Sequence, residues 1–146
     1  MIDKINVLKV QVCSITGLVG TSIVNLFGGW GSDMTTLVTF MAIDFVMGLL
    51  IAGVFKKSNK SVSGALDSKA SWQGLCKKCV TLLFVLIAYR LDLSLGTDYI
   101  KSAAIIAFIA NEILSIVENA GLMGIKLPVA ISDAIEVLVR KGGDNK

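Results

Sequence analysis

Residues 34–55 read MTTLVTFMAIDFVMGLLIAGVF, and this stretch decides the fold class of the 146-residue chain. Asp44 is the only charged residue in it. A helix needs about 20 predominantly apolar residues to cross the hydrocarbon core of a bilayer, and this run is long enough. Its apolar residues are continuous rather than alternating, which favours a membrane-spanning helix over a strand of a membrane barrel.

The composition of the whole chain also indicates a membrane protein. Hydrophobic residues make up 54% of the sequence and charged residues 17%, and the mean hydropathy is +0.76. A soluble domain usually carries about 25% charged residues. The composition therefore excludes a disordered chain, a disulfide scaffold and an ordinary soluble enzyme. The chain has no histidine, so it lacks the commonest general base and metal ligand.

Two further runs have the character of membrane spans. One begins near Leu75 or Cys79 and ends before Gly96, and the other extends from Tyr99 to about Met123. The short connection between them, residues 96–98, reads GTD and is typical of a tight turn. We therefore expect these two spans to form an antiparallel helical hairpin.

The N-terminal segment has two interpretations. Residues 10–32 contain no charge, but several polar residues fall within an arc of about 100° on a helix. Such a stripe fits a span that faces a bundle interior or pore, and it also fits a helix lying in the membrane interface. We favour a fourth span. The residues of the stripe are Gln11, Ser14, Thr21, Ser22 and Asn25.

The basic residues predict the orientation in the membrane. The loop at residues 56–78 has six lysines against one aspartate, a net charge of +5, and the positive-inside rule places it in the cytoplasm. With four spans, both termini lie on the same side as this loop. The predicted topology anchors are Lys56, Lys57, Lys77, Lys78 and, at the outer end of its span, Arg90.

These observations predict an all-α integral membrane protein with three or four transmembrane helices and a short amphipathic helix near the C-terminus. In this organisation residues 1–32 form the polar-striped helix, which we expect to be the first span. Residues 33–125 form a three-helix core that contains the basic loop 56–78. Residues 126–146 form a cytoplasmic amphipathic helix, from Val129 to Lys141, and a tail.

Acidic and amide side chains inside the predicted spans require an explanation, because a charge at mid-bilayer costs about 2.5–3.5 kcal/mol. Asp44 shares a helix face with Gly48, and a small residue lets a second helix approach. Either Asp44 pairs across an interface or faces a water-filled lumen, or it is protonated and hydrogen-bonded within the bundle. In the last span a polar face occupies about 120° of the helix. Its members are Asn111, Glu112, Ser115, Glu118 and Asn119.

A single copy with three or four helices has few partners to offer such a polar face. We therefore expect these residues to pair with other copies or to line water, and both outcomes imply a homo-oligomer. The sequence contains no recognisable catalytic, cofactor-binding or metal-binding set. The CxxC pair Cys76 and Cys79 lacks a redox or zinc context, and Trp72 among lysines is typical of a membrane-surface anchor rather than a nucleic-acid patch.

Three pieces of the chain resemble the phage-lysis and toxin-secretion holins, small holins from phages of Gram-positive bacteria. The first is DFVMG at residues 44–48, followed by Ala52. The second is SK at residues 68–69, followed by Gly74 and the lysine pair 77–78. The third and most specific is IANEILSIVENA at residues 109–120, followed by Gly124 and Pro128.

The resemblance implies a non-enzymatic protein that assembles in the cytoplasmic membrane of the bacterial host and permeabilises it at a set time. An endolysin or a toxin then leaves the cell as released cargo, without stable binding. The partners are the bilayer and other copies of the chain, with no nucleic acid and no cofactor. Two alternatives stay open. One is a small oligomeric ion channel or transporter subunit with an intramembrane carboxylate path, and the other is a membrane scaffold or anchor acting through the basic loop and the tail.

Overall fold

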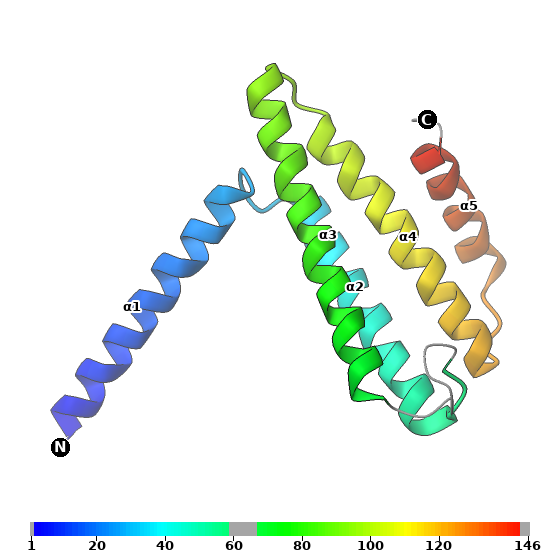
Figure 1. The fold of residues 1–146 in the computed structure, drawn as a ribbon, viewed down its shortest axis with the longest axis horizontal. Coiled ribbons are helices and arrows are strands. Elements are labelled where there is room, and N and C mark those ends of the chain that lie inside the picture. Colours follow the sequence, from blue (N-terminus) through cyan, green and yellow to red (C-terminus); the bar gives the residue numbers. More distant parts are fainter. Residues whose placement is uncertain (1, 59–66, 144–146) are drawn as a thin grey trace. The chain divides into compact units, whose positions relative to one another are not determined.

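The computed structural model describes residues 2–58 and 67–143, and these residues are helical with short connections (Figure 1). They contain no β-strand, so the predicted all-α fold class is confirmed. Lys60, which the sequence places in the basic loop, lies outside the described residues. The elements in chain order are α1 (Ile2–Leu26), α2 (Ser32–Leu50), a π-helical turn η1 (Ile51–Phe55), α3 (Ser68–Leu95), α4 (Ile100–Met123) and α5 (Val129–Gly143).

Within the described part of the chain, three helical segments are long and apolar enough to cross a membrane: Lys4–Leu26, Ser32–Phe55 and Ile100–Met123. They correspond to α1, to α2 with η1, and to α4. Helix α3 differs because charged residues are spread along it, with Lys78 in its first half and Arg90 and Asp92 near its C-terminal end. The total of three or four spans, and the crossing of the membrane by α3, remain predictions from the sequence.

Helix α1 belongs to a compact unit that ends at Gly31, and the second unit begins at Ser32. The apolar side chains of α1 are exposed around its circumference within this unit, as a lipid-facing helix requires. Three of its hydroxyl groups bond back to carbonyl oxygens four residues earlier, and the oxygen–oxygen distances are each 2.8 Å. These bonds satisfy Thr16, Thr21 and Ser22 without a partner helix.

The second unit is built around α2 and α4, which share its largest helix interface. Helix α3 packs mainly on α4 and meets α2 over a small area, and α5 also packs on α4 (Figure 1). The buried face of α2 follows the three- and four-residue spacing of a helix that packs along one stripe. Its buried members are Met34, Leu37, Met41 and Asp44, and Ile51 of η1 continues the stripe.

Asp92 closes the hairpin between α3 and α4. Its carboxylate accepts hydrogen bonds from the Thr97 hydroxyl at 2.6 Å and from the backbone N–H groups of Ile100 and Lys101 at 3.0 and 2.8 Å. The Gly96 N–H bonds to the Asp92 carbonyl with φ at 68°, a conformation that glycine adopts without strain. Asp92 therefore caps the start of α4 as well as ending α3, and the expected antiparallel hairpin is present.

Candidate functional site

Lys78 of α3 lies between two acidic side chains from the other two helices of the bundle. Its Nζ is 2.9 Å from Oδ2 of Asp44 on α2, and it also forms an ion pair with Oε2 of Glu112 on α4. The side chains are largely buried, with exposed fractions of 14% for the lysine and 7% for each acid. An ammonium group has three N–H donors, so Lys78 can bond to both carboxylates at once.

Asn119 completes this ionic cluster, which we define as Asp44, Lys78, Glu112 and Asn119. Its Nδ2 donates to Oδ1 of Asp44 at 2.8 Å, so each Asp44 oxygen has a partner. Two carboxylates and one ammonium leave one negative charge over when all three groups are ionised. Removing Lys78 would leave two buried acids without a counter-ion, which is far costlier than the same change at a surface, whereas removing one acid would leave a balanced pair.

Each member of the cluster occupies an inward position of its own helix. Asp44 continues the buried stripe of α2, and Glu112 and Asn119 lie seven residues apart on α4. Lys78 belongs to a stripe on α3 that repeats at alternating intervals of three and four residues. The members of that stripe are Ser71, Gly74, Lys78, Thr81, Val85, Ala88 and Asp92, and they are buried or half-buried.

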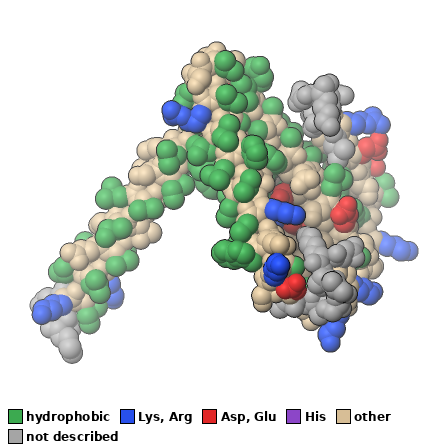
Figure 2. Space-filling model, in the orientation of Figure 1, with side chains coloured by type: hydrophobic (Ala, Val, Ile, Leu, Met, Phe, Trp, Pro, Cys, Tyr) green, Lys and Arg blue, Asp and Glu red, His purple; other side chains and the backbone are tan. Residues whose placement is uncertain are grey.

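A cavity of about 200 Å³, lined by both apolar and polar groups, adjoins the ionic cluster. Gly48 and Ala52 contribute to its wall from α2 and η1, Gly74 and Thr81 from α3, and Ser115 from α4. Figure 2 shows acidic and basic side chains on the face of the second unit, below a largely apolar upper part. Small, apolar, hydroxyl and charged side chains line the cavity together, so the ionic cluster borders open space rather than close packing on this side.

The structure divides the predicted polar face of α4 into two sets. Glu112 and Asn119 are buried in the ionic cluster, whereas Asn111 and Glu118 are exposed, and Ser115 is half-buried. Glu112 and Asn119 depart from the expectation that the polar residues of α4 pair with other copies or line water, because they bond to Lys78 and Asp44 within the chain. Asp44 pairs with Lys78 across a helix interface, which is one of the states expected for it. Gly48 is half-buried and lines the cavity beside Asp44.

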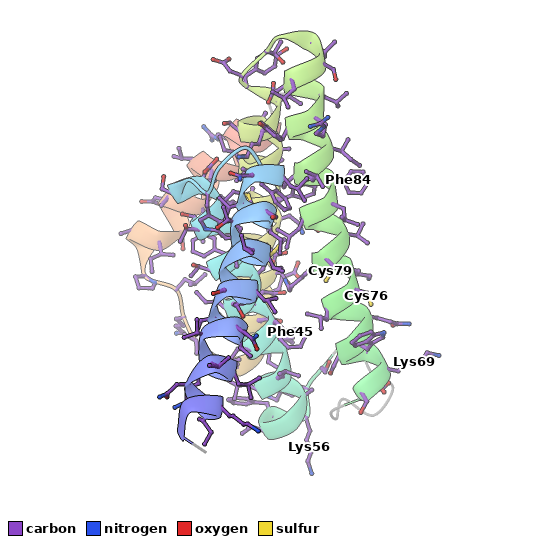
Figure 3. The ribbon with its side chains drawn as sticks, turned by 90° about the vertical axis from the view of Figure 1, so that its left-hand side faces the viewer. Phe45, Lys56, Lys69, Cys76, Cys79 and Phe84 are labelled. Carbon is purple, nitrogen blue, oxygen red and sulfur yellow. The ribbon has the colours of Figure 1, made fainter. Side chains whose placement is uncertain are left out.

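Four of the five predicted topology anchors are exposed: Lys56, Lys57, Lys77 and Arg90. Figure 3 shows Lys56 projecting away from the helices, as Lys69 does. Lys78 differs from these residues because its amine points into the bundle. Sequence reasoning assigned Lys78 to the basic loop and missed its role as an internal counter-ion. The repeating stripe on α3 is the signal that separates Lys78 from the adjacent Lys77.

The cysteine pair on α3 gives no sign of a metal site. Cys76 and Cys79 are free and exposed on this helix (Figure 3). Among the described residues, no three cysteine, aspartate or glutamate side chains are grouped so that they could hold a metal ion. The acids of the ionic cluster instead hold the Lys78 amine.

The fold and its buried ion pairs define a multi-helix membrane protein, since intramembrane ionisable groups normally face one another inside a bundle. The sequence profile of the bacteriophage holin family matches residues 21–140. The chain belongs to this family, as the three sequence pieces predicted. Its matched region includes the end of α1, the whole bundle and most of α5.

One of the similar proteins is named as a probable holin, and two others are uncharacterised. The chain is 32% identical to a probable holin of Bacillus phage phi105 over 97 residues, which cover 66% of each protein. It is 36% identical over 122 residues to an uncharacterised protein of Listeria innocua, covering 83% of this chain and 81% of the relative. An uncharacterised 14.9 kDa protein of Clostridium perfringens, from the nagH 3′ region, is 30% identical and covers 97% of this chain and 99% of its own. No solved structure matches the chain.

Proposed function

We propose that this protein assembles as a homo-oligomer in the cytoplasmic membrane of a bacterial host and permeabilises it at a timed point, releasing an endolysin or a toxin. Family membership and the probable holin among its relatives support the holin role. In this proposal the basic loop and the C-terminus lie in the cytoplasm, as the distribution of lysine residues predicts. The protein performs no catalysis, and the released cargo leaves without being bound.

The exposed face of α4 supports assembly into a homo-oligomer. Five exposed residues on it repeat at intervals of four and three residues, the spacing of a helix that packs along a second helix. Small and polar residues at such positions favour close contact and hydrogen bonding between helices in lipid. We call this set the outer seam; it consists of Ala107, Asn111, Leu114, Glu118 and Gly121.

The outer seam favours association between copies as their density in the membrane rises. Asn111 and Glu118 are costly in hydrocarbon, and contact with another copy or with a shared aqueous lumen removes that cost. Because the cost is relieved only by neighbours or water, assembly depends on the density of copies in the membrane. This dependence supports a sudden onset of permeability after gradual accumulation.

The ion-channel alternative receives less support from the geometry. Its proposed carboxylate path uses Asp44 and Glu112, and the Lys78 amine lies between these two groups. The amine therefore occupies the position between the two acids that a permeating cation would have to take. The exposed polar residues point instead to contacts between copies.

Expression in bacteria that also carry a cytoplasmic peptidoglycan hydrolase tests the proposal. We expect abrupt loss of membrane potential after a delay, followed by lysis that requires both proteins. The double variant Asn111→Ala/Glu118→Ala should delay or abolish both events, whereas Ser102→Ala, which changes an exposed polar residue of α4 outside the outer seam, should leave them unchanged.

Three results would contradict this proposal. Undisturbed growth at high membrane levels would refute permeabilisation. Graded, ion-selective conductance without release of the hydrolase would favour the channel. Full activity of the double outer-seam variant, at wild-type membrane level, would refute assembly through this face of α4.

A further inference from the structure

Helix α3 is fastened to the rest of the bundle at two polar points. At its C-terminal end, Asp92 joins α3 to the start of α4 through the bonds of the hairpin. Further back along the helix, Lys78 bonds to Asp44 and Glu112. Because α2 and α3 otherwise meet over only a small area, the Lys78–Asp44 bond is a principal tie between these two helices.

The packing beside Lys78 is too open to replace this tie. The cavity of about 200 Å³ lies between the N-terminal half of α3 and the C-terminal end of α2. Phe45 and Gly48 line it on the α2 side, and Ala70 and Gly74 line it on the α3 side. Side chains on opposite walls of an open space make few dispersion contacts with one another. Charge attraction, more than close packing, therefore holds this half of α3 against α2.

Loss of the Lys78 bonds would change which partners the buried acids of the bundle need. Asp44 and Glu112 would lose their common counter-ion while remaining in a poorly hydrated environment. Unpaired buried charges are strongly unfavourable, so these carboxylates would then need water or cationic partners. An open protomer with α3 displaced would obtain them most readily in a hydrated assembly of several copies.

We propose that Lys78 is an ionic latch. Its bonds to Asp44 and Glu112 keep the dispersed protomer closed, that is, with α3 held against α2 and α4. These bonds break when copies assemble. This proposal depends on the proposed holin function, and it identifies a residue that helps to set when permeability begins. The outer seam brings copies together, and the latch opposes the opening of each copy. A stronger latch delays the onset of permeability, and a weaker one advances it.

A graded series of variants tests the latch. Lys78→Met removes the cation and should advance the onset of depolarisation and raise the cross-linked oligomer fraction several-fold at equal membrane level. Asp44→Asn keeps the shape of the side chain and leaves Glu112 as a partner, so it should give a smaller change in the same direction. The matched control is Lys77→Met, which removes the adjacent exposed lysine and should leave both measurements unchanged.

A charge exchange distinguishes the ion pair from a general packing effect and covers the case in which Lys78→Met fails to accumulate. The double variant Asp44→Lys/Lys78→Asp keeps one cation and two acids in the cluster. Its onset and oligomer fraction should return toward wild-type values, compared with Lys78→Asp alone. A structural role in which only the shape of Lys78 matters predicts no such recovery.

The cross-linked oligomer fraction and the onset of depolarisation test the latch and the holin function separately. If the wild type cross-links but never depolarises the membrane, the proposed function fails, while the oligomer fractions of the variants still decide the latch. If the wild type depolarises normally and Lys78→Met changes neither measurement at equal membrane level, the latch is refuted. Failure of the charge exchange to improve on Lys78→Asp would refute it as well.

Discussion

The two faces of α4 carry nearly the same polar residues and have opposite surroundings. In the pair Asn111–Glu112 the glutamate is buried and the asparagine is exposed, whereas in Glu118–Asn119 the asparagine is buried and the glutamate is exposed. Adjacent residues of a helix point about 100° apart, so each pair is divided between the bundle and the outside. The inner members bond within the chain, and the outer members lie on the surface of the single copy.

We therefore expect the two faces of α4 to contribute to different processes: the buried face to folding of the protomer and the exposed face to assembly of copies. Glu112 and Asn119 help to join three helices of one protomer, so changing them should affect the stability of that protomer. Asn111 and Glu118 contribute to the outer seam, so changing them should affect contacts between copies. The same chemical groups therefore serve two purposes according to the side of α4 on which they lie.

The largest expected effect compares the two glutamates directly. Glu112→Gln should lower the free energy of unfolding by about 1.5–3 kcal/mol, because Lys78 loses a charged hydrogen-bond partner in a buried place. Glu118→Gln should change it by less than about 0.5 kcal/mol, as is usual for an exposed position. Unfolding of the purified proteins in detergent, followed by circular dichroism, measures both values. Equal losses would break the distinction between the two faces.

A smaller effect is expected at Asp92, a third buried carboxylate. Its hydrogen-bond donors are a hydroxyl and backbone N–H groups rather than a lysine. Asp92→Ala removes the cap of α4 and should cost about 1–2 kcal/mol in the same unfolding measurement. Asp92→Asn should retain most of the stability because its side-chain oxygen still accepts hydrogen bonds. Asp98→Ala, at an exposed aspartate of the same turn, serves as the control. Similar losses for Asp92→Ala and Asp98→Ala would contradict the capping role.

The smallest expected effect lies at an exposed position where the backbone, rather than a charge, is under strain. Lys56 follows the π-helical turn with φ at 51°, in the left-handed region. Lys56→Gly should therefore raise the free energy of unfolding by about 0.5–1 kcal/mol, since glycine adopts this conformation without a steric penalty. Lys57→Gly, next to it in the chain, should produce no gain. A loss of stability in Lys56→Gly would show that the lysine side chain outweighs the strain.

Much of the architecture could be predicted because it follows from local properties of the chain. The apolar run around Asp44 has the length of a membrane span, and the turn at Gly96 lies where the hairpin was expected. The expected C-terminal helix from Val129 to Lys141 corresponds to α5, which ends at Gly143. Helix length, turn residues and hydrophobic pattern each depend on neighbouring residues, so one sequence is enough to recognise them.

The site was only partly predictable, because its partners are 34 or more residues apart in the chain. The sequence indicated that Asp44 and the polar residues of α4 needed partners, and it could not name them. Lys78 was assigned to the basic loop because it stands among exposed lysines. The capping role of Asp92 likewise depends on bonds to residues that follow the turn, up to nine positions further along the chain.

The sequence by itself determined that this is a helical membrane protein of the holin family, since composition, run lengths and local motifs suffice for that assignment. The tertiary structure alone decided which polar groups meet. Burial and ion pairing depend on the rotation and packing of α2, α3 and α4 against one another, and these arise from contacts between distant residues. That packing places Lys78 between Asp44 and Glu112 while leaving Asn111 and Glu118 exposed.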